Sequence, residues 1–110
     1  MLSTQNLHAI GGSMDTETVR VVATPKAYEM IMNSLDNKKV QWAVKTAVSL
    51  ALGKKARDNT DGHLIAGTYL SVWPRWAKSE EDESIIIISD KYVMGTFDKI
   101  LPDCLPIDLA

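Results

Sequence analysis

The chain has one cysteine and two histidines among its 110 residues, and this scarcity excludes several classes of protein. A lone cysteine cannot form an intramolecular disulfide, so nothing indicates an oxidising compartment. No apolar run approaches the roughly 20 residues that a membrane-spanning helix needs. The sequence also contains neither a GxGxxG segment nor a Walker-type phosphate-binding loop. We therefore expect a cytoplasmic protein that enters no membrane and carries no cofactor.

The first residues, 1–13, show no sustained periodicity and lack the basic start and continuous apolar stretch of a signal peptide. They end in Gly11, Gly12 and Ser13, a combination typical of a flexible linker. The whole chain is 45% hydrophobic and 24% charged, as soluble globular domains are. We predict a flexible leader over residues 1–13 and a single domain over residues 14–110.

The small net charge of −2 conceals an uneven distribution of charge. Residues 1–58 carry eight Lys or Arg and five Asp or Glu, a balance of +3, whereas residues 59–110 carry four and nine, a balance of −5. A chain with this polarity can present a basic surface to an acidic partner, or associate head to tail. The alternative is that these charges only decorate solvated loops.

Alternation and helical periodicity divide the N-terminal half into three elements. Residues 18–24 alternate in the way of a half-buried strand. Thr24 and Pro25 are typical of a helix N-cap and a first helical position, which predicts a helix beginning there. Over residues 38–55 the apolar residues recur at helical spacing and cover more than a minimal stripe. This second helix should be broadly buried, with Trp42 on its polar side.

The C-terminal half changes to β-type runs, at residues 63–73, 84–89 and 91–97. The order β-α-α-β-β-β predicts an α+β two-layer domain, a small antiparallel sheet with the helix pair on one face. The run SIIIIS at residues 84–89 is apolar on both faces and should form the central strand. Because the helix pair covers only one face, either the C-terminal tail or a second subunit must cover the other. A homodimer is therefore one of two expectations.

The segments AGTYLSVWP and MGTFDKILP, which contain Gly67 and Gly95, share a pattern of Gly, Thr, an aromatic residue and a final Pro. Glycine within a β-type run commonly marks a bulge or a bend. We interpret the pattern as one structural solution used twice. Gly67 and Gly95 should lie at equivalent bends, with Tyr69 and Phe97 turned toward the same core.

Residues that could carry catalysis are few. His63 lies at a loop–strand junction, and Cys104 lies beside Asp103, a carboxylate that would raise the pKa of the thiol. The segment 58–63 has oxygen ligands and a glycine, but it lacks the third early ligand and the terminal glutamate of an EF-hand calcium loop. We expect no catalytic constellation, no metal site and no enzymatic activity.

The most suggestive local cluster is formed by Trp73, Arg75 and Trp76, which an acidic loop follows. Trp and Arg are favoured in protein-binding hot spots, although such residues also stack on nucleobases or pack inside a domain. The leading hypothesis is a small non-catalytic binding protein of adaptor, inhibitor or subunit type, whose protein partner is not identified. The predicted contact surface comprises Trp73, Arg75, Trp76, Glu80, Glu81, Asp82 and Glu83.

Residues 18–55 resemble a ribbon-helix-helix DNA-binding unit. They combine a short strand with alternating polar residues, a proline at the first helix start, a turn and a second apolar helix. The resemblance implies a dimer whose paired strands enter the DNA major groove, which makes a DNA-binding regulator the alternative to protein binding. The resemblance assigns base contacts to Thr18, Arg20 and Val22, and phosphate contacts to Lys38 and Lys39.

Overall fold

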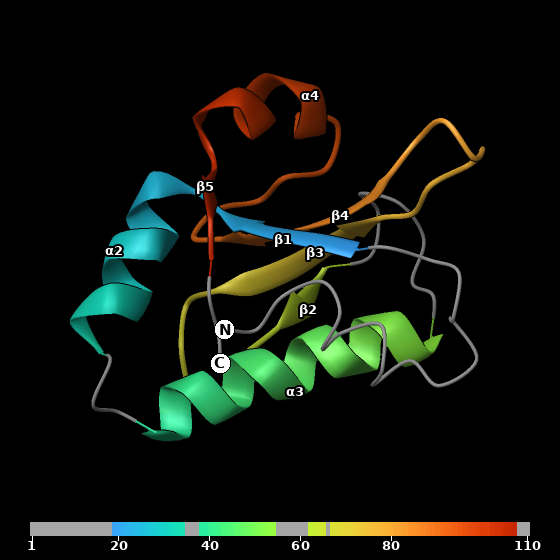
Figure 1. Ribbon diagram of the computed structural model, residues 1–110. Coiled ribbons are helices and arrows are strands. Elements are labelled where there is room, and N and C mark those ends of the chain that lie inside the picture. The colour runs from blue at the N-terminus through green and yellow to red at the C-terminus, as the bar shows by residue number, and fades with distance from the viewer. Residues whose placement is uncertain (1–18, 35–37, 55–61, 66, 108–110) are drawn as a thin grey trace.

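The computed structural model describes four segments of the chain, residues 19–34, 38–54, 62–65 and 67–107. They form a five-stranded sheet with helical segments on both faces, which confirms the α+β class (Figure 1). The elements in chain order are β1 (Val19–Ala23), α2 (Pro25–Asn33), α3 (Lys38–Lys54), β2 (His63–Leu64), β3 (Ser71–Arg75), β4 (Ser84–Ser89), α4 (Phe97–Ile100), the 3-10 turn η1 (Leu101–Asp103) and β5 (Leu105–Pro106). The predicted leader, residues 1–13, lies outside the described residues.

The order of strands across the sheet is β2-β3-β4-β1-β5. The predicted central strand SIIIIS is β4, which lies in the middle and is buried along its full length, as expected. β1 runs parallel to β4, with Val19 opposite Ser84, whereas the other strand pairs are antiparallel. The prediction of a wholly antiparallel sheet is therefore wrong for this pair. The reason is that α2 and α3 carry the chain to the far edge of the sheet, so that β4 returns in the direction of β1.

One face of the sheet is covered by α2 and α3, as the sequence predicts. Val19, Val21 and Ala23 of β1 belong to this core together with Ile86 and Ile88 of β4. The helices contribute Ala27, Ile31, Val44, Ala47, Val48, Ala51 and Leu52. Because each large aliphatic side chain contributes about 1.5–3 kcal/mol when it is buried, this layer is the main hydrophobic core.

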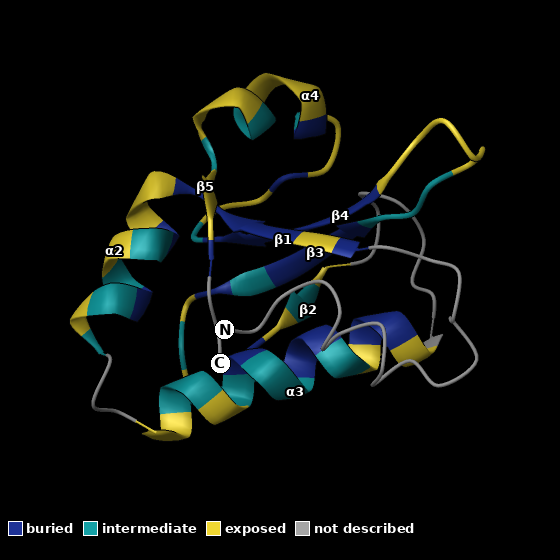
Figure 2. Ribbon diagram, in the orientation of Figure 1, coloured by how far each residue is buried: buried dark blue, intermediate teal, exposed yellow. Residues whose placement is uncertain are grey.

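The opposite face of the sheet is covered by residues 93–104, a segment that contains α4 and η1. Val22, Ile85 and Ile87 belong to this second cluster and pack with Phe97 of α4. Figure 2 accordingly shows β4, and β1 apart from one exposed residue, in the colour of buried residues. Of the two coverings that the sequence left open, the C-terminal part of the same chain is the one observed. The apolar face that suggested a homodimer is thus covered within one chain.

Local sequence signals at the two long helices are confirmed. The side chain of Thr24 accepts a hydrogen bond from the amide of Ala27 (3.4 Å), and Pro25 occupies the first turn of α2. Thr24 is therefore the N-cap. α3 fills nearly the whole of the predicted helix 38–55, and Trp42 lies on its exposed side.

Gly67 and Gly95 have almost the same left-handed backbone, with φ of 82° and 81°. In each turn the next threonine donates both its amide and its hydroxyl to the carbonyl oxygen three residues back. These contacts are Thr68 to Ile65 (3.1 and 2.8 Å) and Thr96 to Val93 (2.8 and 2.7 Å). Positive φ at the third residue of such a turn favours glycine, so the prediction of equivalent bends is confirmed.

The two turns lead into different structures. After Gly67 the chain enters β3 and leaves Tyr69 87% exposed, whereas after Gly95 it enters α4, whose Phe97 is 2% exposed. The expectation that both aromatic residues face one core is therefore wrong for Tyr69. The predicted strand over residues 91–97 is wrong as well, because the turn at Gly95 begins a helix and not a strand.

Candidate functional site

Trp73, the first aromatic residue of the predicted contact surface, is an interior residue. It is 5% exposed and belongs to the cluster on the α4 face of the sheet. Its indole Nε1 donates to Oγ of Ser71 (2.6 Å), and Tyr92 meets the indole edge-on with ring centroids 5.2 Å apart. Gly62 lies so close that a Cβ atom there would come within 2.7 Å of the indole. Since Trp73 offers almost no area to a partner, we remove it from the contact surface.

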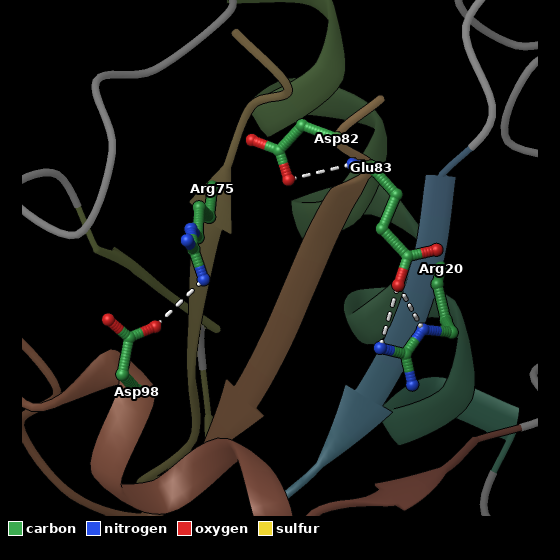
Figure 3. Close-up of polar contacts among 5 residues, drawn as sticks. All are labelled: Arg20, Arg75, Asp82, Glu83 and Asp98. Carbon is green, nitrogen blue, oxygen red and sulfur yellow. Dashed lines mark hydrogen bonds and ion pairs between the residues drawn. The ribbon is translucent and has the colours of Figure 1, made fainter. Parts of the chain in front are cut away.

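Arg75 and Trp76 are also held by contacts within the domain. Arg75 of β3 forms an ion pair with Asp98 of α4 (2.9 Å) (Figure 3). The Arg75 guanidinium also lies 5.2 Å from the centroid of the Phe97 ring. These contacts attach α4 to the sheet. Trp76 is partly buried and packs against the core on the face of the sheet that α2 and α3 cover. Trp73 and Trp76 thus belong to opposite faces of the sheet and do not form one surface.

The acidic loop between β3 and β4 is exposed, but part of it is already engaged. Glu83 accepts hydrogen bonds from Nε (3.1 Å) and Nη2 (2.9 Å) of Arg20 on β1, and Asp82 accepts one from the backbone amide of Glu83 (2.9 Å) (Figure 3). Glu80 and Glu81 are exposed at the tip. The seven predicted residues therefore separate into an aromatic and arginine group held within the domain and an exposed acidic loop.

The residues that the ribbon-helix-helix resemblance assigns to DNA do not form one exposed surface. Thr18 lies outside the described residues, Val22 is buried beneath the α4 segment, and Arg20 is engaged in an ion pair. β1 pairs with β4 on one side, and on the other side β5 pairs with Val22 and Ala23, so a strand from a second subunit could not pair along the full length of β1. Lys38 and Lys39 are exposed at the start of α3.

Cys104 and His63 show no catalytic arrangement among the described residues. Burial raises the pKa of the Cys104 thiol, the charge of Asp103 raises it further, and Arg20 lowers it. The thiol donates to the carbonyl oxygen of Ile100 (3.3 Å), as a packed, protonated cysteine does. Nε2 of His63 is buried without a hydrogen-bond partner in the described segments. The same segments contain no group of three or more His, Cys, Asp or Glu residues that could hold a metal ion.

Exposed apolar side chains meet where α3 lies beside the edge strand β2. Trp42 and Leu50 of α3 are 69% and 49% exposed, and Leu64 of β2 is 72% exposed. A hollow of about 150 Å³ lies among them. We call this hollow the α3–β2 groove, and its lining comprises Trp42, Ala43, Thr46, Ala47, Leu50, Leu64 and Ile65.

The spacing of residues on α3 explains the shape of the groove. Trp42, Thr46 and Leu50 recur every fourth residue and therefore share one side of the helix. The hydroxyl of Thr46 donates to the carbonyl oxygen of Trp42 (2.8 Å), so this polar group is satisfied within the helix. Ala43 and Ala47 are small, and they leave space between the larger side chains.

Positive charge adjoins the groove. The sequence of α3 contains four lysines and neither Asp nor Glu. Lys38 and Lys39 are exposed in the turn that precedes Trp42, and Lys38 lies one helical turn from it. An apolar hollow beside ammonium groups suits a ligand surface that combines apolar and acidic side chains.

The sequence prediction missed this groove. Helical spacing did indicate that Trp42 faces away from the core, and Leu50 lies two turns further along the same side. Leu64 carries no comparable signal, because its position beside α3 depends on how β2 pairs at the edge of the sheet. The only sequence signal for this groove was a Trp and a Leu on the same exposed side of the helix.

Comparisons with models of protein families, with curated proteins and with solved structures find no match for this chain. In the segments that the structure describes, no helix is both long and apolar enough to span a bilayer.

Proposed function

We propose that this protein acts by binding another protein, as an adaptor, inhibitor or subunit without catalytic activity, and that the α3–β2 groove is its contact surface. The observation that supports the proposal is the exposure of Trp42, Leu50 and Leu64 around one hollow. Large apolar side chains clustered on a surface mark interaction sites, and Trp is enriched in binding hot spots. Exposing such apolar surface to water is unfavourable in free energy, and a partner that buries the surface removes this penalty.

The size and the charge of the groove indicate the chemistry of the partner. Its volume of about 150 Å³ is below the roughly 300–1,000 Å³ of small-molecule sites, and it fits inserted side chains better than a whole cofactor. Lys38 and Lys39, which are exposed at the start of α3, favour carboxylates beside the inserted groups. The partner segment should therefore present Leu, Phe or Trp flanked by Asp or Glu.

Nucleic acid would also be attracted by lysines near a tryptophan. Leu50 and Leu64 border the same hollow, however, and such apolar walls offer nothing to a phosphate backbone. They favour a protein segment. Nucleic-acid binding is kept as an outcome of the test, recognised by a steep loss of affinity as salt increases.

Selection from a random peptide library displayed on phage tests the proposal and does not require the partner to be identified first. Recovered peptides should combine apolar aromatic or leucine side chains with acidic residues. Their affinity for Trp42→Ala and for Leu64→Ser should fall at least about tenfold, the effect of removing a hot-spot side chain. The matched control is Leu105→Ser, because Leu105 is an exposed leucine on the opposite edge strand, β5.

Two results would contradict the proposal. Selected peptides could bind the Trp42 and Leu64 variants as tightly as the unaltered protein, which would place the contact elsewhere. Alternatively, selection could yield no peptide, while a DNA duplex binds with strong salt dependence. That outcome would favour the DNA-binding alternative.

A further inference from the structure

The carboxyl ends of β1 and β4 lie next to each other, because these two strands are adjacent and parallel. From β1 the chain continues into α2, which packs on one face of the sheet. From β4 it continues into the segment 93–104, which packs on the opposite face. Neighbouring parallel strands whose connections leave to opposite faces open a crevice between them, and this is where ligands bind in open α/β sheets.

A cleft of about 430 Å³ lies at this point of the fold. Its volume falls within the roughly 300–1,000 Å³ typical of small-molecule sites. The start of α2, the turn after β4, and α4 with η1 all contribute to its wall. The lining comprises Thr24, Pro25, Lys26, Asp90, Lys91, Ile100 and Asp103.

Hydrogen bonds hold the polar floor of the cleft in place. Thr24 donates its hydroxyl to Oδ1 of Asp90 (2.8 Å) and its amide to the carbonyl oxygen of Ile88 (3.0 Å). The buried hydroxyl of Ser89 accepts from the amide of Lys91 (3.1 Å) and donates to the carbonyl oxygen of the same residue (2.9 Å). Asp90 and the backbone of Lys91 are thus positioned before a ligand arrives, which lowers the entropic cost of binding.

The charges that line the cleft are balanced. Lys26 and Lys91 contribute two ammonium groups, and Asp90 and Asp103 contribute two carboxylates. Within the described segments neither lysine forms an ion pair. A purely anionic ligand would meet two carboxylates, and a purely cationic one would meet two ammonium groups. A small molecule that carries one charge of each sign avoids both conflicts.

We propose that this cleft binds a free amino acid or a closely similar amino-carboxylate zwitterion. The ligand carboxylate pairs with the ammonium groups of Lys26 and Lys91. The ligand ammonium lies toward Asp90 and Asp103. Ile100 and Pro25 supply apolar wall for the aliphatic part of the ligand.

Amide chemical-shift titrations of the intact protein test the proposal. The probes are individual amino acids at millimolar concentration, with acetate and methylammonium as matched single-charge probes. At least one amino acid should give saturable shifts that are largest at the cleft residues. Each single-charge probe should bind about tenfold more weakly or worse, because it lacks one charge-assisted contact.

Two charge-removing variants and two matched controls complete the test. Lys26→Gln and Asp103→Asn should each weaken amino-acid binding roughly tenfold. Lys99→Gln and Glu29→Gln remove the same charges at exposed positions outside the cleft lining and should leave affinity unchanged.

Three results would overturn the assignment. The first is that no amino acid binds saturably. The second is that acetate binds as tightly as the best amino acid, and the third is that binding is lost in Lys26→Gln but unchanged in Asp103→Asn. The last two would describe an anion site. The α3–β2 groove takes no part in these titrations, so their outcome is independent of the proposed protein contact.

Discussion

Trp73 and Trp42 have the same side chain in opposite surroundings. Trp73 is enclosed by Gly62 and Tyr92 within the domain. Trp42, in contrast, lines an open hollow together with Leu64. The apolar area of Trp73 already stabilises the fold, and that of Trp42 is still available to a partner. Substitutions at the first should therefore lower stability, and substitutions at the second should lower binding.

The largest effect on stability is expected for Trp73→Ala. Removal of a buried tryptophan leaves a cavity and should lower the free energy of unfolding by about 3–5 kcal/mol. Trp42→Ala should change it by no more than about 0.5 kcal/mol, as substitutions at exposed positions do. Urea unfolding followed by circular dichroism measures both values. Equal losses of unfolding free energy in the two variants would contradict the distinction between a buried Trp73 and an exposed Trp42.

An intermediate effect is expected for Gly62→Ala. The new Cβ atom would lie 2.7 Å from two carbons of the Trp73 ring, so the ring or the strand must shift. Overpacking of this kind costs about 1–3 kcal/mol. The matched control is Gly53→Ala in α3, where a Cβ meets nothing within 4 Å and where alanine should stabilise by up to about 1 kcal/mol. If both variants kept or gained stability in urea, the close packing around Trp73 would be refuted.

The smallest effect is expected at the ion pair that attaches α4 to β3. Asp98 is largely exposed, so Asp98→Ala should lower the free energy of unfolding by only about 0.2–1 kcal/mol. Arg75→Ala should cost somewhat more, because the arginine also lies over the Phe97 ring. A double-mutant cycle in urea, repeated at high salt, separates the two contributions. A loss above about 2 kcal/mol for Asp98→Ala would show that this contact is more than a surface pair.

Local features of the fold could be predicted from the sequence, and long-range pairing could not. The N-cap at Thr24, the helix around Trp42 and the two glycine bends depend on residues a few positions apart. The parallel pairing of β1 with β4 depends on how the intervening helices cross the sheet. The wrongly predicted strand over residues 91–97 has the same cause, because the turn at Gly67 leads into a strand and the equivalent turn at Gly95 leads into a helix.

The proposed contact surface could be predicted from the sequence less well than the fold could. Helical phase predicted that Trp42 is exposed, but it could not place Leu64 beside it. Trp73 and Arg75 have the composition of a hot spot, yet their partners are Tyr92 and Asp98 of the same chain. Composition alone therefore cannot distinguish a contact surface from an internal cluster. Burial is what separates them.

Photo-cross-linking in cells of the source organism tests the central claim, that the α3–β2 groove contacts a protein partner, most directly. A photoreactive phenylalanine derivative would replace Trp42, Leu64, Leu105 or Glu81 in turn, the last within the acidic loop. We expect a covalent adduct of one and the same protein from positions 42 and 64, and none from position 105. An adduct formed from position 81 but from neither groove position would contradict the claim and assign the contact to the acidic loop.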